Sequence, residues 1–165
     1  YRQWMQDEII YANFNNLNLK ETRRLGADLY INWQITDTVS ARLDYSWIDA
    51  QIGSDGFDGS EVPLVPEHKL RASVEWLPSE PIRILLGASY TDDVYVGGDF
   101  ANGSDELDGY VLFDMSARYA LTEDIDLFAT VDNLFDKEYV STAFGPDALY
   151  PGVGRSGRIG LLWKF

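Results

Sequence analysis

The sequence predicts an all-β transmembrane protein, an antiparallel up-and-down β-barrel to which this chain contributes about eight strands. Three observations predict this class. Apolar and polar residues alternate with a period of two over several long stretches, as they do in strands with two unlike faces. Polar turns of four residues alternate with long loops rich in Gly, Asp and Ser. Aromatic residues make up 14% of the chain and gather near the ends of the alternating stretches.

Composition restricts the classes of protein further. With 165 residues, 45% of them hydrophobic, the chain suits one sizeable domain and is not a disordered polyelectrolyte. A net charge of −14 leaves no basic stripe, so we expect no nucleic-acid partner. The chain has no cysteine, which excludes disulfides and thiolate metal sites. No apolar run approaches the roughly 18–20 residues of a membrane-spanning helix.

The strands are expected in the following order. A first strand near Met5–Ala12 precedes a short loop at Asn13–Lys20. Five alternating stretches follow, each with one apolar and one polar face, and all but the fourth alternate cleanly: 25–35, 39–47, 69–76, 82–90 and 111–119. In the fourth stretch, Leu85 falls on the otherwise polar face. The last strand ends at Phe165.

The connections repeat with a fixed period. Short turns begin at Thr36, Ser79 and Thr122, which are 43 positions apart, and a further 43 positions reach Phe165. Between them lie three long loops: 53–66, 97–109 and 141–154. Propeller blades have a similar period, but a blade contains four short strands. Two strands per period, each of about 10–15 residues, better match the ~9–11 residues of a tilted membrane-spanning strand.

A spanning sheet is expected to close into a barrel with an apolar outside and a polar lumen. Aromatic residues should form two girdles at the membrane interfaces. One lies near the short turns (Trp33, Trp76, Tyr119, Trp163 and Phe165) and the other near the long loops (Tyr45, Trp47, Tyr90 and Tyr95). Because bacterial barrels have short periplasmic turns, the long loops face outward. A soluble sandwich with these aromatics in its core is the alternative.

At this point the sequence resembles a known family, the TonB-dependent outer-membrane receptors. Residues 131–139, VDNLFDKEY, resemble the family's NLFDKxY signature, with Asn133, Leu134, Phe135, Asp136 and Tyr139 at the signature positions. YPGVGR at 150–155 and RIGLLWKF at 158–165 resemble the family's following loop and terminal strand. RLGAD at 24–28 and PEH at 66–68 give weaker support, and the order of these motifs agrees over nearly the whole chain.

The resemblance implies that residues 1–165 are the C-terminal part of a 22-stranded barrel in the bacterial outer membrane. The plug domain and the earlier strands are then expected outside this sequence, which agrees with a start at Tyr1 and with the lack of a signal peptide. The implied function is active uptake of a scarce ligand, most commonly an iron–siderophore complex, with energy from TonB. The implied partners are a small-molecule ligand, the plug, the other strands, the TonB complex and outer-membrane lipid.

The terminal strand has a role of its own in this interpretation. Ile159, Leu161, Trp163 and Phe165 share one face, which should contact lipid. A terminal aromatic behind alternating apolar residues resembles the signal read by the barrel-assembly machinery. A different interpretation is a complete small barrel of eight strands with a structural or adhesive role. Sequence upstream of Tyr1 would distinguish the two.

No enzyme chemistry is expected. His68, the one histidine, has no Ser or Cys motif around it, so we predict a structural role, no catalytic residue and no cofactor. Acidic loops predict a solvated surface and no metal site; the alternative is calcium at Asp55, Asp58 and Glu61, although they do not fit the EF-hand pattern. Six further acidic residues lie between Asp92 and Asp108.

Charged residues of the polar face are expected to pair between neighbouring strands, at ~0.2–1 kcal/mol each, or else to contact the plug. The cations are Arg42, Arg71, Arg83, Arg118, Arg158 and Lys164, and the anions are Asp28, Asp44, Glu75 and Asp114. The strands near 5–12 and 155–165 are expected to be edges that promote aggregation.

Overall fold

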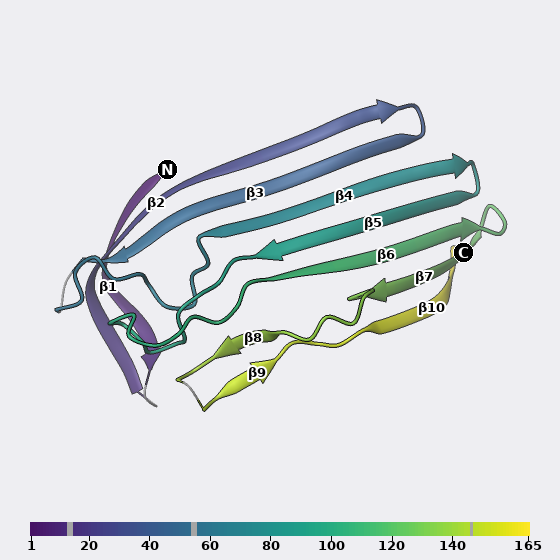
Figure 1. Cartoon of the computed structure of the whole chain (residues 1–165). Coiled ribbons are helices and arrows are strands. Elements are labelled where there is room, and N and C mark those ends of the chain that lie inside the picture. Colours follow the sequence, from purple (N-terminus) through teal and green to yellow (C-terminus); the bar gives the residue numbers. More distant parts are fainter. Residues whose placement is uncertain (13–14, 54–55, 146) are drawn as a thin grey trace.

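The computed structural model describes residues 1–12, 15–53, 56–145 and 147–165, and it leaves the side chains of 10–12 and 15–17 undescribed. The chain forms a single curved layer of long antiparallel strands (Figure 1). No helix in the described part of the chain has the length and hydropathy that a membrane crossing requires.

The main sheet has eight strands in the order β1-β2-β3-β4-β5-β6-β7-β10, with β1 and β10 at its two edges. Their bounds are β1 Arg2–Ala12, β2 Asn15–Thr36, β3 Val39–Ile52, β4 His68–Ser79, β5 Ile82–Thr91, β6 Tyr110–Ala120, β7 Ile125–Asp132 and β10 Ser156–Trp163. A separate hairpin, β8 Val140–Ala143 and β9 Leu149–Pro151, interrupts the last pair. The expected strand order and number are therefore confirmed, as are the predicted edges.

The sequence-based boundaries need one correction. The loop expected at 13–20 is wrong over most of its length, because β2 runs for 22 residues from Asn15 and pairs with β1 up to Ala12. Hydrophobic alternation weakens in this polar part of β2, so the strand was not apparent. The three short turns lie where they were predicted, and they all lie at the end of the sheet that carries the C-terminus (Figure 1).

Strand register brings the apolar residues of neighbouring strands together on one face. Leu43 lies opposite both Ile31 and Ala72, and Phe113 lies opposite Ala88. The face continues to β10, where Leu161 lies opposite Leu127. These residues do not converge into a core: Leu29 is 48% exposed and Phe113 is 42% exposed. A single-layer sheet with one apolar and one polar face results, rather than a soluble sandwich.

Aromatic residues mark two levels of the apolar face. Trp76 lies opposite Val39 and Ile84 near the short turns, and Tyr119 lies in the same region opposite Ile82. At the other level, Tyr45 and Tyr90 both lie opposite Leu70. Trp47 lies opposite His68 of β4. His68 and Trp76 are eight residues apart on that strand, so the two aromatic levels are separated by about 26 Å along it. This spacing is close to the ~25 Å apolar band of bacterial barrels.

Beyond Trp47 the two faces of β3 exchange their chemistry. Asp49 and Gln51 follow on the face of Trp47, whereas Ala50 and Ile52, on the opposite face, are buried. Ala50 and Ile52 pack under the long loops as part of one small cluster of buried residues: Leu19, Ala50, Ile52, Val62 and Phe100. The inversion is visible in the sequence and shows where the apolar band of the outer face ends.

The long loops are joined to one another by backbone hydrogen bonds. Leu64 N–H donates to the carbonyl of Tyr95 at 3.0 Å, and Gly97 N–H donates to the carbonyl of Ala143 at 2.8 Å. Gly97 is needed at this crossing, since a β-carbon there would lie 2.7 Å from the ring of Phe144. Loops far apart in the sequence thus form one layer over the end of the sheet that is opposite the short turns (Figure 1).

Candidate functional site

Charged side chains of the polar face form pairs, although not all between the residues predicted. Arg42 bonds Asp44 at 2.8 Å along its own strand. Arg83 reaches Glu75 across β4 and β5 at 3.3 Å. Near the short turns, Asp126 accepts bonds from Arg118 and, at 3.5 Å, from Lys164.

The sequence analysis missed two of the acidic partners on this face, Asp126 and Asp132. Arg158 lies 3.8 Å from Asp132. The signal was present in β7, whose sequence IDLFATVD alternates and places Asp126, Phe128, Thr130 and Asp132 on one face. Asp114, which was expected to pair with a cation, instead accepts a hydrogen bond from the backbone N–H of Asn133 at 2.9 Å.

Two neighbouring hollows lie on the polar face, and Lys69 and Arg71 line both of them. Each hollow has a volume of about 380 Å³. The first is bounded by Tyr110, strand β8 and the carboxylates of Asp92 and Asp108, and the second by Tyr30 and Asp44. Within the described residues, no carboxylate lies within ion-pair distance of Lys69 or Arg71, and both side chains are exposed. Two cations beside phenol groups could bind an anionic group.

The signature residues 133–139 form a compact irregular segment between β7 and β8. Asn133 is buried, and its side chain donates to the carbonyls of Lys137 at 2.9 Å and Val153 at 3.2 Å and accepts from Lys137 N–H at 2.8 Å. Asp136 accepts from Arg155 N–H at 2.8 Å. Asn133 and Asp136 both have positive φ, at 50° and 55°, which Asn and Asp tolerate better than most residues. Side chains thus replace the hydrogen bonds that strand pairing would otherwise supply.

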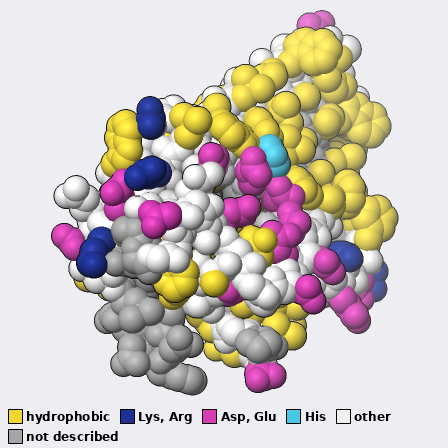
Figure 2. Space-filling model, turned by 60° about the vertical axis from the view of Figure 1, so that its left-hand side comes forward, with side chains coloured by type: hydrophobic (Ala, Val, Ile, Leu, Met, Phe, Trp, Pro, Cys, Tyr) yellow, Lys and Arg dark blue, Asp and Glu magenta, His cyan; other side chains and the backbone are white. Residues whose placement is uncertain are grey.

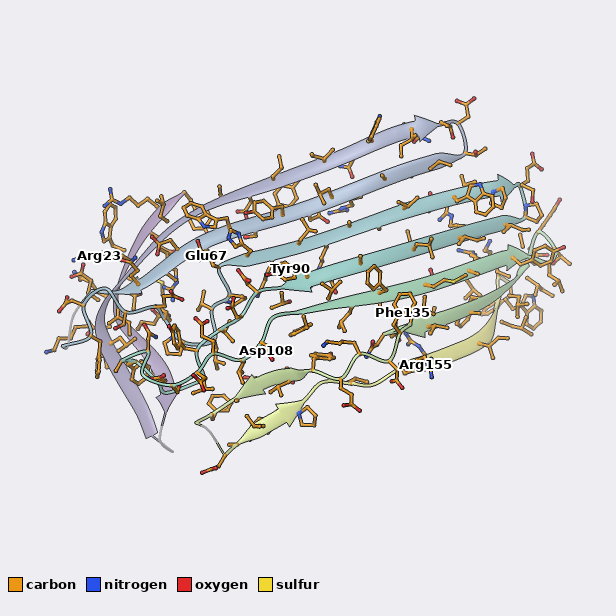
Figure 3. The ribbon with its side chains drawn as sticks, in the orientation of Figure 1. Arg23, Glu67, Tyr90, Asp108, Phe135 and Arg155 are labelled. Carbon is orange, nitrogen blue, oxygen red and sulfur yellow. The ribbon has the colours of Figure 1, made fainter. Side chains whose placement is uncertain are left out.

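Aromatic residues of the signature cover this segment on both faces of the sheet. Phe135 is exposed and meets the ring of Phe113 edge-on at 5.3 Å on the apolar face. Tyr139 packs on Tyr110 with ring centroids 4.3 Å apart. The backbone N–H of Leu134 donates to the carbonyl of Phe113 at 2.6 Å. Figure 3 shows Phe135 and Arg155 at the junction of β7 and β10, so the signature joins the last two long strands of the sheet.

The terminal strand presents its predicted residues on the apolar face. Ile159 lies opposite Ala129 and is 76% exposed, and Trp163 lies opposite Ile125. Leu161 is likewise exposed, and Phe165 extends past the strand; among the described residues its ring partner is Trp163, at 6.2 Å. On the other face, Gly160 makes room for the ring of Phe128.

Acidic side chains gather at the end of the sheet that carries the long loops (Figure 2). Burial, and then the charges of Glu67 and Asp49, raise the pKa of Glu61. Burial, and then a hydrogen bond with Asp93, raise the pKa of Glu106. Asp99 differs from both: burial acts to raise its pKa, but hydrogen bonds from Ser104 and Gly103 lower it overall.

The calcium candidates are only partly visible. Asp55 lies outside the described residues, and Asp58 and Glu61 are exposed. Glu61 shares two hydrogen bonds with Asn102 through its backbone, at 2.6 and 3.2 Å. Over the described ranges, no group of three or more His, Cys, Asp or Glu side chains is placed to hold a metal ion. The predicted absence of a metal site and its alternative, calcium at these residues, both stay untested.

His68 lies on the apolar face at the aromatic level near the loops. Its Nδ1 is 2.8 Å from the hydroxyl of Tyr45, and the two rings stack with centroids 5.9 Å apart. Nearby, Trp47 Nε1 donates to Glu67 at 2.7 Å. The contacts place the histidine among interface aromatics.

Comparison with known proteins gives a consistent result. The family model "TonB dependent receptor-like, beta-barrel" matches residues 1–134. The "probable TonB-dependent siderophore receptor PiuA" of Acinetobacter baumannii is 27% identical over 161 residues, covering 90% of this chain and 21% of the relative. The metal-pseudopaline receptor CntO of Pseudomonas aeruginosa is 31% identical over 143 residues, covering 82% of this chain and 20% of the relative.

Solved structures agree with this result. The crystal structure of the siderophore receptor PiuA from Acinetobacter baumannii superposes with a TM-score of 0.83 and 25% identity. The match covers 99% of this chain and 25% of that chain. The chain thus spans about a fifth to a quarter of the length of these relatives.

Proposed function

The chain belongs to the TonB-dependent receptors of the bacterial outer membrane, and from this premise we propose that it forms part of the wall of an importer for a scarce ligand. Uptake through that wall uses energy delivered by TonB, which contacts the receptor outside the residues of this chain. The reaction is transport, and no bond of the ligand is broken by this segment.

The proposed ligand is a metal chelate, with an iron–siderophore complex as the first candidate. Two relatives with high coverage of this chain carry names that refer to a siderophore and to metal-pseudopaline. Such chelates are commonly anionic, and on the polar face Lys69 and Arg71 line a hollow near Asp92 and Asp108 but form no ion pair with an acid among the described residues. Charge complementarity of this kind favours capture of anions.

The observation that carries the proposal is the division of the sheet into two faces. The apolar face is exposed and bounded by two levels of aromatic residues, as expected of a surface in contact with lipid. The polar face carries the ion pairs and the hollows, as expected of a surface that faces a lumen. Arg42, Arg83 and Arg118 on that face are the proposed contacts with the plug domain.

The hydrogen bonding of the signature segment, residues 133–139, supports the proposal that this part of the sheet lies in the bilayer. Irregular backbone at membrane depth must be hydrogen-bonded within the protein, because lipid offers no partners. Asn133 and Asp136 meet this requirement with their side chains, and Phe135 covers the segment on the apolar face. We propose that this is why these residue types stand at these positions.

The terminal strand is the proposed element for assembly. Phe165 makes few contacts within the chain, and its role is therefore better explained by recognition outside it. We assign Ile159, Leu161, Trp163 and Phe165 to recognition by the barrel-assembly machinery and to contact with lipid.

A complete barrel of eight strands is less well supported. Closure would pair the outer edge of β1 with the outer edge of β10. In the described part of the chain, β1 pairs on one side, with β2, and β10 pairs on one side, with β7, so the sheet is open. The relatives are also about four to five times longer than this chain.

Uptake of a radiolabelled ferric siderophore tests the proposal. The protein is expressed in an outer membrane that lacks other iron receptors, with and without TonB, and siderophores of several chemical types are supplied. We expect TonB-dependent accumulation of at least one, and weaker uptake in the Lys69→Gln/Arg71→Gln variant. Arg2→Gln, on the apolar side of the sheet, is the control. Accumulation that is equal without TonB would refute the proposal.

A further inference from the structure

The three long loops of the chain meet at one glycine, Gly97. Its backbone N–H donates to the carbonyl of Ala143 in β8 at 2.8 Å, and its carbonyl accepts from the N–H of Gly145 at 3.1 Å. Two residues earlier, the carbonyl of Tyr95 accepts from the N–H of Leu64 at 3.0 Å. The loop between β5 and β6 is thus bonded both to the loop before β4 and to hairpin β8–β9. We call these five residues the loop clasp.

Side chains from both neighbouring loops close over Gly97. A β-carbon on this residue would lie 2.7 Å from the ring of Phe144. It would also lie 3.0 Å from Cδ1 of Leu64 and from the carbonyl oxygen of Ala143, which is fully buried. The φ of Gly97 lies outside the left-handed region, so its backbone conformation is open to other residues. Glycine is therefore required here by the close approach of three loops and not by its conformation.

Leu64 has an unfavourable backbone conformation at the same point. Its φ is 62°, in the left-handed region that a bulky apolar residue seldom adopts. It follows Pro63 in a turn, at the position where glycine or asparagine is usual. Glycine there would relieve the strain, but it would remove the Cδ1 that packs on Gly97. Strained residues persist where the surrounding structure holds them, and this contact explains why leucine stands at position 64.

All three clasped loops line the first hollow of the polar face. Lys69 and Arg71 line it from β4. The loops contribute, among others, Leu64, Leu107 and Thr142. The two cations are placed by the pairing of β4 with β3 and β5. The three loop residues lie outside the main sheet, so contacts between the loops hold them around the hollow.

From these observations we propose that Gly97 is a positioning residue for ligand binding, because through the loop clasp it holds the three long loops as one unit around the first hollow. The unit surrounds Lys69 and Arg71 with a wall of fixed shape, and a preformed wall lowers the conformational entropy that binding costs. The three loops should then move together or not at all. The effect on binding rests on the proposed import function, whereas the coupling between the loops does not.

Hydrogen exchange of the full-length protein in detergent, without ligand, tests the coupling. Gly97→Ala should raise the exchange rates of the Leu64 and Gly145 amides, which lie in the other two loops. We expect an increase of about three- to tenfold, the equivalent of one lost hydrogen bond, while the amides of β4, β5 and β6 exchange as in the wild type. Gly103→Ala is the matched control, since it lies in the same loop as Gly97 and a β-carbon there meets nothing closer than Asp99, at 4.0 Å.

Leu64→Gly approaches the clasp from the opposite loop. It relieves the strain at φ 62° and removes only the side chain that packs on Gly97, so the protein should assemble even if Gly97→Ala does not. It should raise exchange at the Gly97 amide. Unchanged exchange in the opposite loops of both variants, an equal increase in Gly103→Ala, or lost protection throughout β4, β5 and β6 would each overturn the clasp.

Uptake tests the consequence for binding. The probes are radiolabelled ferric catecholate and ferric hydroxamate siderophores. Gly97→Ala should raise KM by about two- to tenfold, the cost of ordering wall residues on binding, and should leave the maximal rate unchanged because TonB supplies the energy. An unchanged KM would overturn the positioning role. If the wild type shows no TonB-dependent uptake of either probe, the proposed function fails, and hydrogen exchange still decides whether the loops are coupled.

Discussion

The ring of Tyr139 lies directly against Gly152, so that a β-carbon on Gly152 would lie 2.1 Å from Cζ of the ring. Gly152 N–H also donates to the carbonyl of Tyr139 at 2.8 Å. The signature segment and the loop before the terminal strand are thus held together at a position where no side chain larger than hydrogen fits.

Gly152→Ala should therefore destabilise the barrel by about 1–3 kcal/mol, the usual cost of forcing atoms into a packed site. Either the ring of Tyr139 leaves Tyr110, or the backbone moves. Urea unfolding of the full-length protein in detergent measures the change. Gly87→Ala is the control, since a β-carbon there meets nothing closer than 3.9 Å. Equal stability of the two variants would show that the contact does not matter.

Asn133→Ala should cost more than Asn133→Asp. Alanine removes the three hydrogen bonds of the buried Asn133 side chain, with the carbonyls of Lys137 and Val153 and the N–H of Lys137, at about 0.5–1.5 kcal/mol each. Aspartate keeps the acceptor and also tolerates the positive φ of 50°. The same unfolding experiment ranks the variants, and a reversed order would contradict the roles given to the amide.

Phe165→Ala should reduce the amount of assembled protein far more than the stability of what assembles. The side chain is fully exposed, and a ring contact with Trp163 is the interaction that the structure gives it. Folded protein in outer-membrane fractions and the urea midpoint of the purified protein measure the two effects separately. Leu162→Ala, on the opposite face of β10, should assemble normally. A large loss of stability without a loss of assembly would argue for packing instead of recognition.

Loop stability should fall as pH rises above the usual pKa of a glutamate. An acid whose pKa is raised on folding binds more protons in the folded than in the unfolded chain. Glu61 and Glu106 therefore favour the folded loops at low pH, and this advantage is lost as pH passes from the usual carboxyl pKa through the raised values. Glu61→Gln/Glu106→Gln should equal the wild type in acid and exceed its free energy of unfolding at neutral pH. If the difference in free energy of unfolding between the variant and the wild type became smaller as pH rose, the prediction would be wrong.

Residues 1–165 by themselves should not refold into a soluble monomer. β1 and β10 leave two strand edges, and the apolar face stays exposed. Sedimentation after refolding without detergent should show aggregates. A sharp, cooperative thermal transition of a monomer would contradict both the edges and the assignment of the apolar face.

Much of this fold is determined by the sequence alone. Side chains alternate between the two faces of any strand, so VSARLDYSW at 39–47 already separates Leu43 from Arg42 without knowledge of its neighbours. The turns at Thr36, Ser79 and Thr122 are local in the same sense, and so is the apolar phase of the terminal strand. The change of phase after Trp47 was equally available, although the sequence analysis did not use it.

Only the tertiary structure decided which distant groups meet. The contacts of Gly97 with Ala143 and of Asn133 with Val153 join residues that no local pattern relates. Arg118 and Lys164 pair with Asp126 and not with acidic residues that are nearer in the sequence, because strand register and curvature set the distances between side chains. Period-two alternation is a property of one strand, whereas these contacts depend on how strands and loops are placed together in space.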